Sequence, residues 1–296
     1  MKIYTLDLNF QNVPQSIAAY LVVGPAGPVL VETGPGSTLV TLQAEIRRCG
    51  YELSDIQHVF VTHIHLDHAG AAGWWAQQGA QVYVHHFGVT HLIDPSRLWQ
   101  SASRIYGDKM ELLWGQMWPA PVEKVTAVAD NDVFHAAGLT FTALETPGHA
   151  RHHHVWQVED IAFTGDAAGI RLPHNPLIDV PAPPPEFDRE TWLETLDRLQ
   201  AANFTALYPT HFGRLEDVNH QLDTMRALID EATDFIRAKM LSGSHRDEIV
   251  PLYENWVRER GQALGLSAAQ MHQYEMANPL YMSVDGIMRY WRKLDM

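Results

Sequence analysis

The stretch THIHLDH, residues 62–68, contains four side chains of types that bind metal ions: His63, His65, Asp67 and His68. It directly follows the apolar run 58–61, which is typical of a buried strand. Side chains two residues apart in an extended chain point the same way, so His63 and His65 can face one site. Imidazoles and carboxylates are ligands for zinc, iron, manganese or nickel. The alternative is a polar loop with coincidental histidines. Four metal-binding side chains directly after an apolar strand disfavour it.

Three further residues of the same chemical types occupy equivalent positions later in the chain: His149, Asp166 and His211. Each comes just after a predicted strand and beside a glycine or proline that turns the chain sharply. Loops that leave one edge of a sheet converge in space, so these side chains can meet around a common centre. Each alone is a weak signal. Together with residues 63–68 they predict one metal site.

Short apolar runs separated by turn residues predict the strands that would position these side chains: 16–23, 28–32, 58–61, 81–84, 140–144, 155–158, 161–164 and 205–208. Helices predicted at 39–48 and 70–78 alternate with them, which indicates an α/β layered domain. The proline-rich segment 173–185 predicts an extended connection. From residue 216 onward, apolar stripes at helical spacing predict helices throughout. We therefore expect an α/β domain at 1–215 and a helical C-terminal extension at 216–296.

The ligand set and its order along the chain resemble those of the metallo-β-lactamase fold superfamily, in particular the glyoxalase II-like metallo-hydrolases. The resemblance covers residues 1–215 and implies a four-layer αββα sandwich with metals at one edge of its two sheets. It also implies the ligand assignment. One ion would be bound by His63, His65 and His149, a second by Asp67, His68 and His211, and Asp166 would bridge both.

The chemistry of this ligand set agrees with the resemblance. Three imidazole ligands leave a coordination position open for water. Two ions about 3.5–4 Å apart can hold a bridging hydroxide and polarise a carbonyl. We expect two divalent ions, zinc ahead of iron or manganese, in a dinuclear hydrolase of a small ester, thioester, lactone or amide. The metal-bridging hydroxide is the expected nucleophile, and Asp67 is the expected catalytic residue because it can guide a proton to the leaving group.

An iron-containing oxidoreductase or oxygen-binding protein on the same ligand set is the alternative function. Flavodiiron proteins of the superfamily typically have Glu at the second position of the motif, where this chain has His65. The sequence also has no appended flavin-binding domain. Both features disfavour a diiron protein, whereas a persulfide dioxygenase-like mononuclear iron site stays open.

Several other residues have two interpretations. Glu32 stands where the superfamily often has Asp, and it can orient a ligand from behind. Of His152, His153 and His154, one or two can face the site because successive strand residues alternate, and His153 or His154 could support the ligands. Arg171 and His174 follow Asp166 closely and could contact an anionic substrate group. Residues 91–118 contain apolar side chains at helical spacing, which favours a packed helical excursion over a lid.

Composition narrows the expected partners. The 296 residues carry a formal net charge of -14, with 21 basic residues that form no cluster, so neither nucleic acid nor an anionic membrane is expected. The single cysteine, Cys49, excludes an intramolecular disulfide and a cysteine-rich metal site. No leader-like N-terminus and no run of roughly 18 apolar residues is seen. We expect a cytoplasmic enzyme with a small-molecule substrate, and a homodimer stays open.

Overall fold

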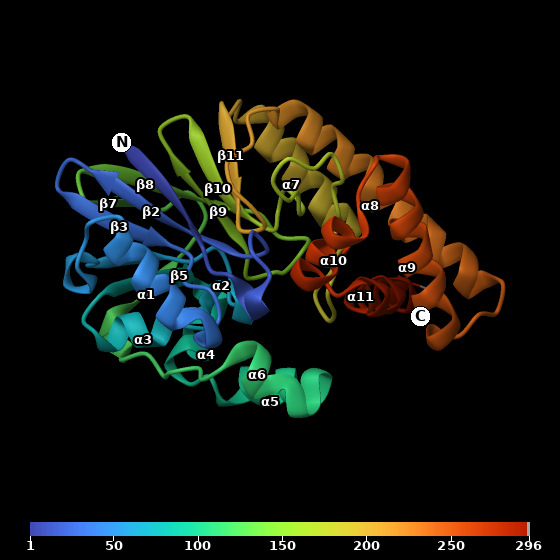
Figure 1. Ribbon diagram of the computed structural model, residues 1–296, viewed down its shortest axis with the longest axis horizontal. Coiled ribbons are helices and arrows are strands. Elements are labelled where there is room, and N and C mark those ends of the chain that lie inside the picture. Colours follow the sequence, from blue (N-terminus) through green and yellow to red (C-terminus); the bar gives the residue numbers. More distant parts are fainter. Residues whose placement is uncertain (295–296) are drawn as a thin grey trace.

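The strands form two stacked sheets in the computed structural model, which describes residues 1–294 (Figure 1). The six-stranded sheet has the order β1 (Lys2–Asp7), β2 (Ala18–Gly24), β3 (Gly27–Val31), β4 (His58–Phe60), β5 (Gln81–His85) and β6 (Val125–Val128). The five-stranded sheet has the order β11 (Ala206–Pro209), β10 (Ile161–Gly165), β9 (His154–Val158), β8 (Leu139–Glu145) and β7 (Val133–Ala136). Strands β3 to β6 pair in parallel, and β10 pairs in parallel with β11.

Alternating side chains on these strands bury both faces of the first sheet. In β2, Tyr20 and Val22 join the core between the sheets, whereas Leu21 joins the core under the neighbouring helices. Across the two sheets Phe60 stacks on Phe141, with ring centroids 4.1 Å apart. This two-sided burial explains why the strands have near-continuous apolar sequences.

Helices cover the outer face of each sheet (Figure 1). Helices α1 (Leu39–Arg48), α3 (Ala72–Gln77) and α4 (Val89–Ile93) lie on one side, and α7 (Arg189–Ala201) and α8 (Val218–Leu241) on the other. The C-terminal region continues with α9 (Arg246–Ala263), α10 (Ala268–Ala277) and α11 (Leu280–Leu294). The predicted αββα layers and the helical C-terminal region are therefore confirmed. No helix within residues 1–294 is long and apolar enough to cross a membrane.

The predicted boundary between an α/β domain at 1–215 and a helical extension at 216–296 stays a prediction. Residues 295 and 296 of that extension lie outside the described chain. Helix α11 packs on both α8 and α9. It also holds the proline-rich connection, because Ser283 Oγ donates to Val180 O at 2.9 Å and accepts from Ala182 N at 3.2 Å. Next to it, Asn278 Nδ2 donates to the buried Asp179 carboxylate at 2.7 Å. The C-terminal helices thus fix the course of residues 179–182.

Two helix predictions were wrong in detail. The predicted helix 70–78 begins earlier, as the short α2 (Leu66–Ala69) followed by α3, so Asp67 and His68 lie on a helical turn. The apolar residues of the predicted helical excursion 91–118 do not lie on a single helix. They are divided chiefly between α5 (Ser96–Tyr106) and α6 (Met110–Trp114), because Gly107 adopts a positive φ of 52° between them. Strands β1, β6 and β7 were missed because their sequences mix polar and apolar residues without a long apolar run.

Replacing Gly286 with Ala tests the contact between α11 and the proline-rich connection. A Cβ at this position would overlap the carbonyl group of Ala182, so the helix must move away. We expect the free energy of unfolding to fall by about 1–3 kcal/mol despite the better helix propensity of Ala. Denaturant unfolding measures the change. The matched control is Gly261→Ala in α9, where the Cβ would meet only the flexible end of Met271, and an equal loss in both variants would contradict the expectation.

Candidate metal centre

All seven predicted ligands come together at one edge of the two sheets. The first three follow β4 or β8 and form one group, His63, His65 and His149, whose ligand nitrogens lie within 4.8 Å of one another. His65 Nδ1 lies 2.9 Å from His63 Nε2 and 2.9 Å from His149 Nε2. Ligand atoms around a tetrahedral ion, each bonded at about 2.0–2.1 Å, are separated by about 3.3–3.4 Å. The three nitrogens are therefore close to the spacing that one ion requires.

The second group consists of Asp67, His68 and His211. The Nε2 atom of His211 lies 3.4 Å from Asp67 Oδ2, and that of His68 lies 3.7 Å from the same oxygen. Asp166 lies between the groups. Its Oδ2 is 3.3 Å from His149 Nε2, and its Oδ1 is 3.4 Å from His68 Nε2. One carboxylate thus presents an oxygen to each group, which is the geometry of a bridging ligand.

Two buried atoms at this centre have no hydrogen-bond partner within the described chain: His68 Nε2 and Asp166 Oδ1. A buried polar atom without a partner is costly, and native structures have few of them. Both atoms belong to side chains that surround the same space. The donor set, its spacing and these two atoms all fit a pair of divalent cations.

Hydrogen bonds behind the ligands fix the orientation of their rings. Nδ1 of His149 donates to Pro181 O and Nδ1 of His211 donates to Ser16 O, each at 2.7 Å. A carbonyl oxygen only accepts, so Nδ1 carries the proton in both rings. When the ring is neutral, the remaining nitrogen, Nε2, has a lone pair directed at the centre.

Glu32 connects the two sides of the centre from behind. Its carboxylate, 1% exposed, accepts from Thr62 Oγ1 at 2.5 Å, from Thr210 Oγ1 at 3.4 Å and from His68 Nδ1 at 3.3 Å. This agrees with the expected orienting role of Glu32. Thr62 and Thr210 were not singled out in the sequence, because a threonine beside a ligand carries no signal without knowledge of which segments meet.

The three neighbouring histidines have separate environments. Asp166 N donates to His153 Nε2 at 3.2 Å, while His153 Nδ1 donates to Thr146 Oγ1 at 2.8 Å, so His153 supports the bridging residue. His154 points away and stacks near His85, with ring centroids 5.9 Å apart. His152 lines the cavity described below, and its Nε2 lies 3.3 Å from Glu186. Of the two supports considered from sequence, the structure selects His153.

Burial keeps the first group neutral. It lowers the pKa of His63 and His149 and, helped by the repulsion of His149, that of His65 to about 3. Neutral imidazole is the form that binds a metal. These three residues are therefore ready to bind a cation at neutral pH.

In the second group the carboxylates oppose the effect of burial. Burial acts to lower the pKa of His68 and His211, but Asp166 and Asp67 raise both above the usual value. Burial acts to raise the pKa of Asp67, yet His68 and His211 lower it to about 2. The group contains an ionised carboxylate that stabilises protons on its imidazoles, as it would stabilise a metal cation.

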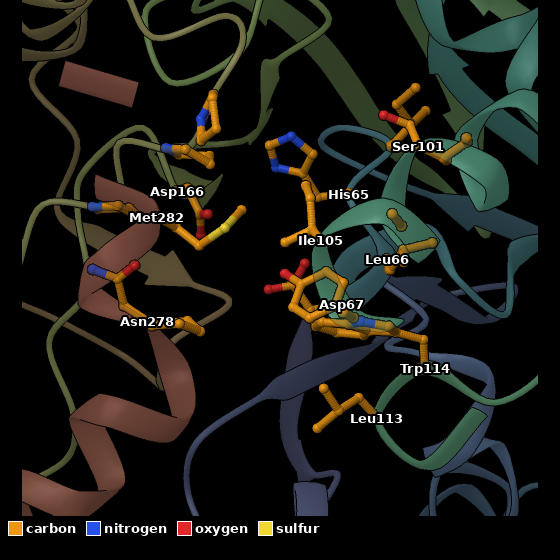
Figure 2. Close-up of a pocket in the computed structure, with 18 of the residues that line it drawn as sticks. His65, Leu66, Asp67, Ser101, Ile105, Leu113, Trp114, Asp166, Asn278 and Met282 are labelled. Carbon is orange, nitrogen blue, oxygen red and sulfur yellow. The ribbon is translucent and has the colours of Figure 1, made fainter. Parts of the chain in front are cut away.

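A cavity of about 640 Å³ opens above the ligands. Figure 2 shows Asp67 and Asp166 facing each other, with Ser101, Ile105 and Trp114 on one side and Asn278 and Met282 on the other.

The 91–118 segment combines both predicted roles, since it packs Ala102 against Leu66 and also lines the cavity. Arg171 and His174 do not line it, so their expected contact with substrate is not supported. The cavity wall formed by α10 and α11 could not be predicted, because the apolar residues of these helices have the spacing of an ordinary core helix.

Comparison with known proteins identifies the family. The model of the metallo-beta-lactamase superfamily matches residues 13–211, so the chain belongs to this superfamily, whose members typically bind divalent metals. Crystal structures of a metallo-beta-lactamase family protein from Thermus thermophilus (TM-score 0.70, 20% identity, 99% of this chain and 94% of that one) and of an archaeal superfamily protein from Sulfolobus tokodaii (0.65, 19%, 97% and 98%) have the same fold.

Alignments with curated relatives cover only part of each of those proteins. A metallo-beta-lactamase fold-containing protein of Sulfurisphaera tokodaii is 28% identical over 62% of this chain and 68% of its own length. The lactamase-like protein adaB of Aspergillus niger is 29% identical over 76% of this chain, and an atrochrysone carboxyl ACP thioesterase of Aspergillus fumigatus is 25% identical over 71%. The alignments span only 61% and 40% of these two fungal proteins.

Replacing Glu32 with Gln tests the support behind the second group. The amide keeps the size of the side chain but removes the charge that holds His68 and Thr62. We expect zinc affinity at the weaker of two sites to fall by about 10–100-fold, as for other groups that orient ligands. Competition with a chromogenic chelator measures both affinities. Glu123→Gln, on an exposed side chain, is the control, and unchanged affinities in Glu32→Gln would contradict the assigned role.

The raised pKa values of His68 and His211 predict how metal uptake depends on pH. Both imidazoles hold protons over a wider pH range than a free histidine, so a cation must displace those protons. The competition strengthens as pH falls through the raised pKa values, and zinc affinity should therefore be lower at about pH 6 than at about pH 8. Calorimetry in two buffers of different ionisation enthalpy measures the released protons. Equal affinities at both pH values, with no release, would be the contrary result.

Proposed function

We propose that this protein is a dinuclear metal-dependent hydrolase that cleaves a small ester, thioester, lactone or amide. The observation that carries the proposal is the pair of ligand groups sharing Asp166 at the floor of a cavity with largely apolar walls. A protein that only bound metal would need neither a shared carboxylate nor an adjoining cavity large enough for a small molecule. Membership of a superfamily of hydrolase type supports the same interpretation.

The two groups would hold one divalent ion each, with zinc the first choice for an imidazole-rich donor set. His63, His65 and His149 would bind the first ion, Asp67, His68 and His211 the second, and Asp166 would bind both. When bound, the ions supply a hydroxide nucleophile at neutral pH and polarise the carbonyl group of the substrate.

Asp67 is the residue that we assign to proton transfer. Its side chain lines the cavity beside the second ligand group, and an ionised carboxylate is the form that takes up a proton. The carboxylate therefore can accept the proton of the attacking water and return it to the leaving oxygen, sulfur or nitrogen. His211, at 3.4 Å, holds this carboxylate in place.

An ester or thioester is the substrate type that the relatives favour. One of them is named an acyl carrier protein thioesterase, although the alignment covers 40% of that protein. Hydrolysis of a thioester and of an oxygen ester requires the same attack on a polarised carbonyl, so one centre suits both.

Metal removal tests the hydrolase directly. We expect chelator-treated protein to lose esterase activity, and stoichiometric zinc to restore it, because the nucleophile depends on the ions. His63→Ala should lose activity by at least about 100-fold and bind fewer ions, whereas His135→Ala, on an exposed residue of β7, should keep both. The assays are 4-nitrophenyl ester hydrolysis and elemental analysis. Bound iron with oxygen-dependent turnover and no hydrolysis would instead identify the oxidoreductase.

Asp67→Asn separates proton transfer from metal binding. Asparagine retains one oxygen that can approach a metal but accepts no proton, so kcat should fall by about 100-fold or more. Because the fall is in the chemical step, KM should change far less. Steady-state kinetics and metal analysis of the same preparation provide the two readouts. A variant with two bound ions and an unchanged kcat would exclude Asp67 as the proton carrier.

A further inference from the structure

The cavity has two apolar walls that come from different parts of the chain. Helices α5 and α6 contribute Leu98, Ala102, Ile105, Leu113 and Trp114. Opposite them lie Met276 and Ala277 of α10 and Met282 of α11. Figure 2 shows Ile105 and Trp114 facing Met282 and Asn278 across the ligands. Apolar side chains on both sides suit an apolar group of the substrate.

The cavity is also lined by two exposed cations. Ala102, Ala277 and Met282 are buried, whereas Arg97 and Lys109 are exposed and line the cavity mouth. Arg97 lies at the beginning of the 11-residue α5, and Lys109 lies just after its end. The mouth is therefore bordered by a cation at each end of a helix about 16 Å long.

These two cations differ from the other charged residues of the cavity. Every carboxylate that lines it already has a partner. Glu186 pairs with Arg151 at 2.8 Å, Glu275 pairs with Arg258 at 3.5 Å, and two aspartates belong to the metal centre. Within residues 1–294, Arg97 and Lys109 form no ion pair of 4.0 Å or less. The carboxylate that Arg97 acts on electrostatically is Asp94, whose pKa it helps to lower and which does not line the cavity. In a chain with a net charge of -14, two unpaired cations at one cavity mouth indicate an anionic ligand group.

We propose that the substrate is an acyl thioester with an apolar acyl group and a phosphate-bearing thiol part. The acyl group occupies the deep apolar part of the cavity, and the phosphate lies at the mouth near Arg97 and Lys109. This arrangement places the anion on the leaving group, because the acyl side of the cavity is apolar. The inference rests on the proposed hydrolase function and specifies its substrate class.

The reaction balances with water alone. The carbonyl carbon forms a bond to the oxygen of water, the carbon–sulfur bond breaks, and the electron pair leaves with sulfur. One proton of the water ends on the thiolate, the other is released to solvent, and the acid leaves as a carboxylate. The products are a fatty or aromatic acid and a phosphate-bearing thiol.

Matched substrates separate the two parts of the proposal. Octanoyl-coenzyme A carries phosphates, octanoyl-pantetheine has the same thioester without them, and 4-nitrophenyl octanoate is neutral. We expect the zinc-loaded protein to hydrolyse octanoyl-coenzyme A with about fivefold higher kcat/KM than octanoyl-pantetheine, since two exposed ion pairs together add about twofold to thirtyfold in affinity. Octanoyl-acyl carrier protein tests whether the phosphate comes from a protein carrier, and faster turnover of it would assign that source.

Charge variants test the assigned residues. Arg97→Gln combined with Lys109→Gln should raise KM for octanoyl-coenzyme A by about fivefold, because two exposed ion pairs are lost, and should leave KM for 4-nitrophenyl octanoate within about twofold of the wild-type value. Arg104→Gln is the matched control, because Arg104 is an exposed residue of α5 that does not line the cavity. A KM that is unchanged in the double variant, or raised equally by Arg104→Gln, would overturn the role of these cations.

An apolar variant tests the acyl site. Met282, 9% exposed, lines the cavity, whereas Met288, 3% exposed, lies on the same helix α11 and does not line it. Met282→Ala should reduce the preference for octanoyl over acetyl thioesters by about fivefold to tenfold, and Met288→Ala should not change it. An unchanged preference would overturn the acyl site.

Failure of this inference is distinguishable from failure of the hydrolase. Hydrolysis of 4-nitrophenyl octanoate, with octanoyl-coenzyme A no better than octanoyl-pantetheine, would remove the phosphate requirement and leave the hydrolase intact. Absence of hydrolysis for every ester and thioester, with zinc bound, would overturn both.

Discussion

Burial of charge at the junction of the two sheets is the constraint on which the rest of the structure depends. Glu32 and Asp166 are almost fully buried, and an unpaired carboxylate in such a place costs several kcal/mol. Each is stabilised by groups that come from distant parts of the sequence: Thr62 and Thr210 for Glu32, and His68 and His149 for Asp166. The strand ends must therefore lie at fixed distances, and the stacked sheets provide that rigidity.

The C-terminal helices participate in the same constraint at a distance. Helix α11 fixes the backbone of residues 180–182 through Ser283 and through the close approach at Gly286. Within that segment, Pro181 O accepts the proton of His149 Nδ1 and so orients a ligand. The same helices contribute Met276 and Met282 to the cavity. One structural unit thus couples the orientation of a ligand to the shape of the substrate site.

The seven candidate ligands could be predicted because each is a residue type that binds metals and each follows a predicted strand in the sequence. His63 to His68 directly follow an apolar run, and His149, Asp166 and His211 each follow another strand. The residues behind them could not be predicted, since Thr62 and Thr210 meet Glu32 only after segments 178 residues apart come together. Proximity in sequence was also misleading, because Arg171 lies near Asp166 in the chain but its Nε donates to Asn175 O instead of facing the cavity. The edge strands β1 and β7 lack the two-sided burial that made the central strands recognisable.

Local charge outweighs net charge at the cavity mouth. A net charge of -14 opposes the approach of any anion, but at physiological ionic strength salt screens exposed charges beyond about 8 Å. An anion at the mouth therefore responds chiefly to the charges within that distance. There Glu186 pairs with Arg151 at 2.8 Å, whereas within residues 1–294 no carboxylate lies within 4.0 Å of a side-chain nitrogen of Arg97 or Lys109, and Asp94 acts on Arg97 only from a greater distance. Helix α5 presents Arg97 on the same face as Leu98 and Ala102, because positions 97, 98, 101, 102 and 105 all line the cavity, and Lys109 follows the end of this helix. A single amphipathic face thus provides both the apolar contact and the charge, and a substrate that combined the two would use the whole length of the helix.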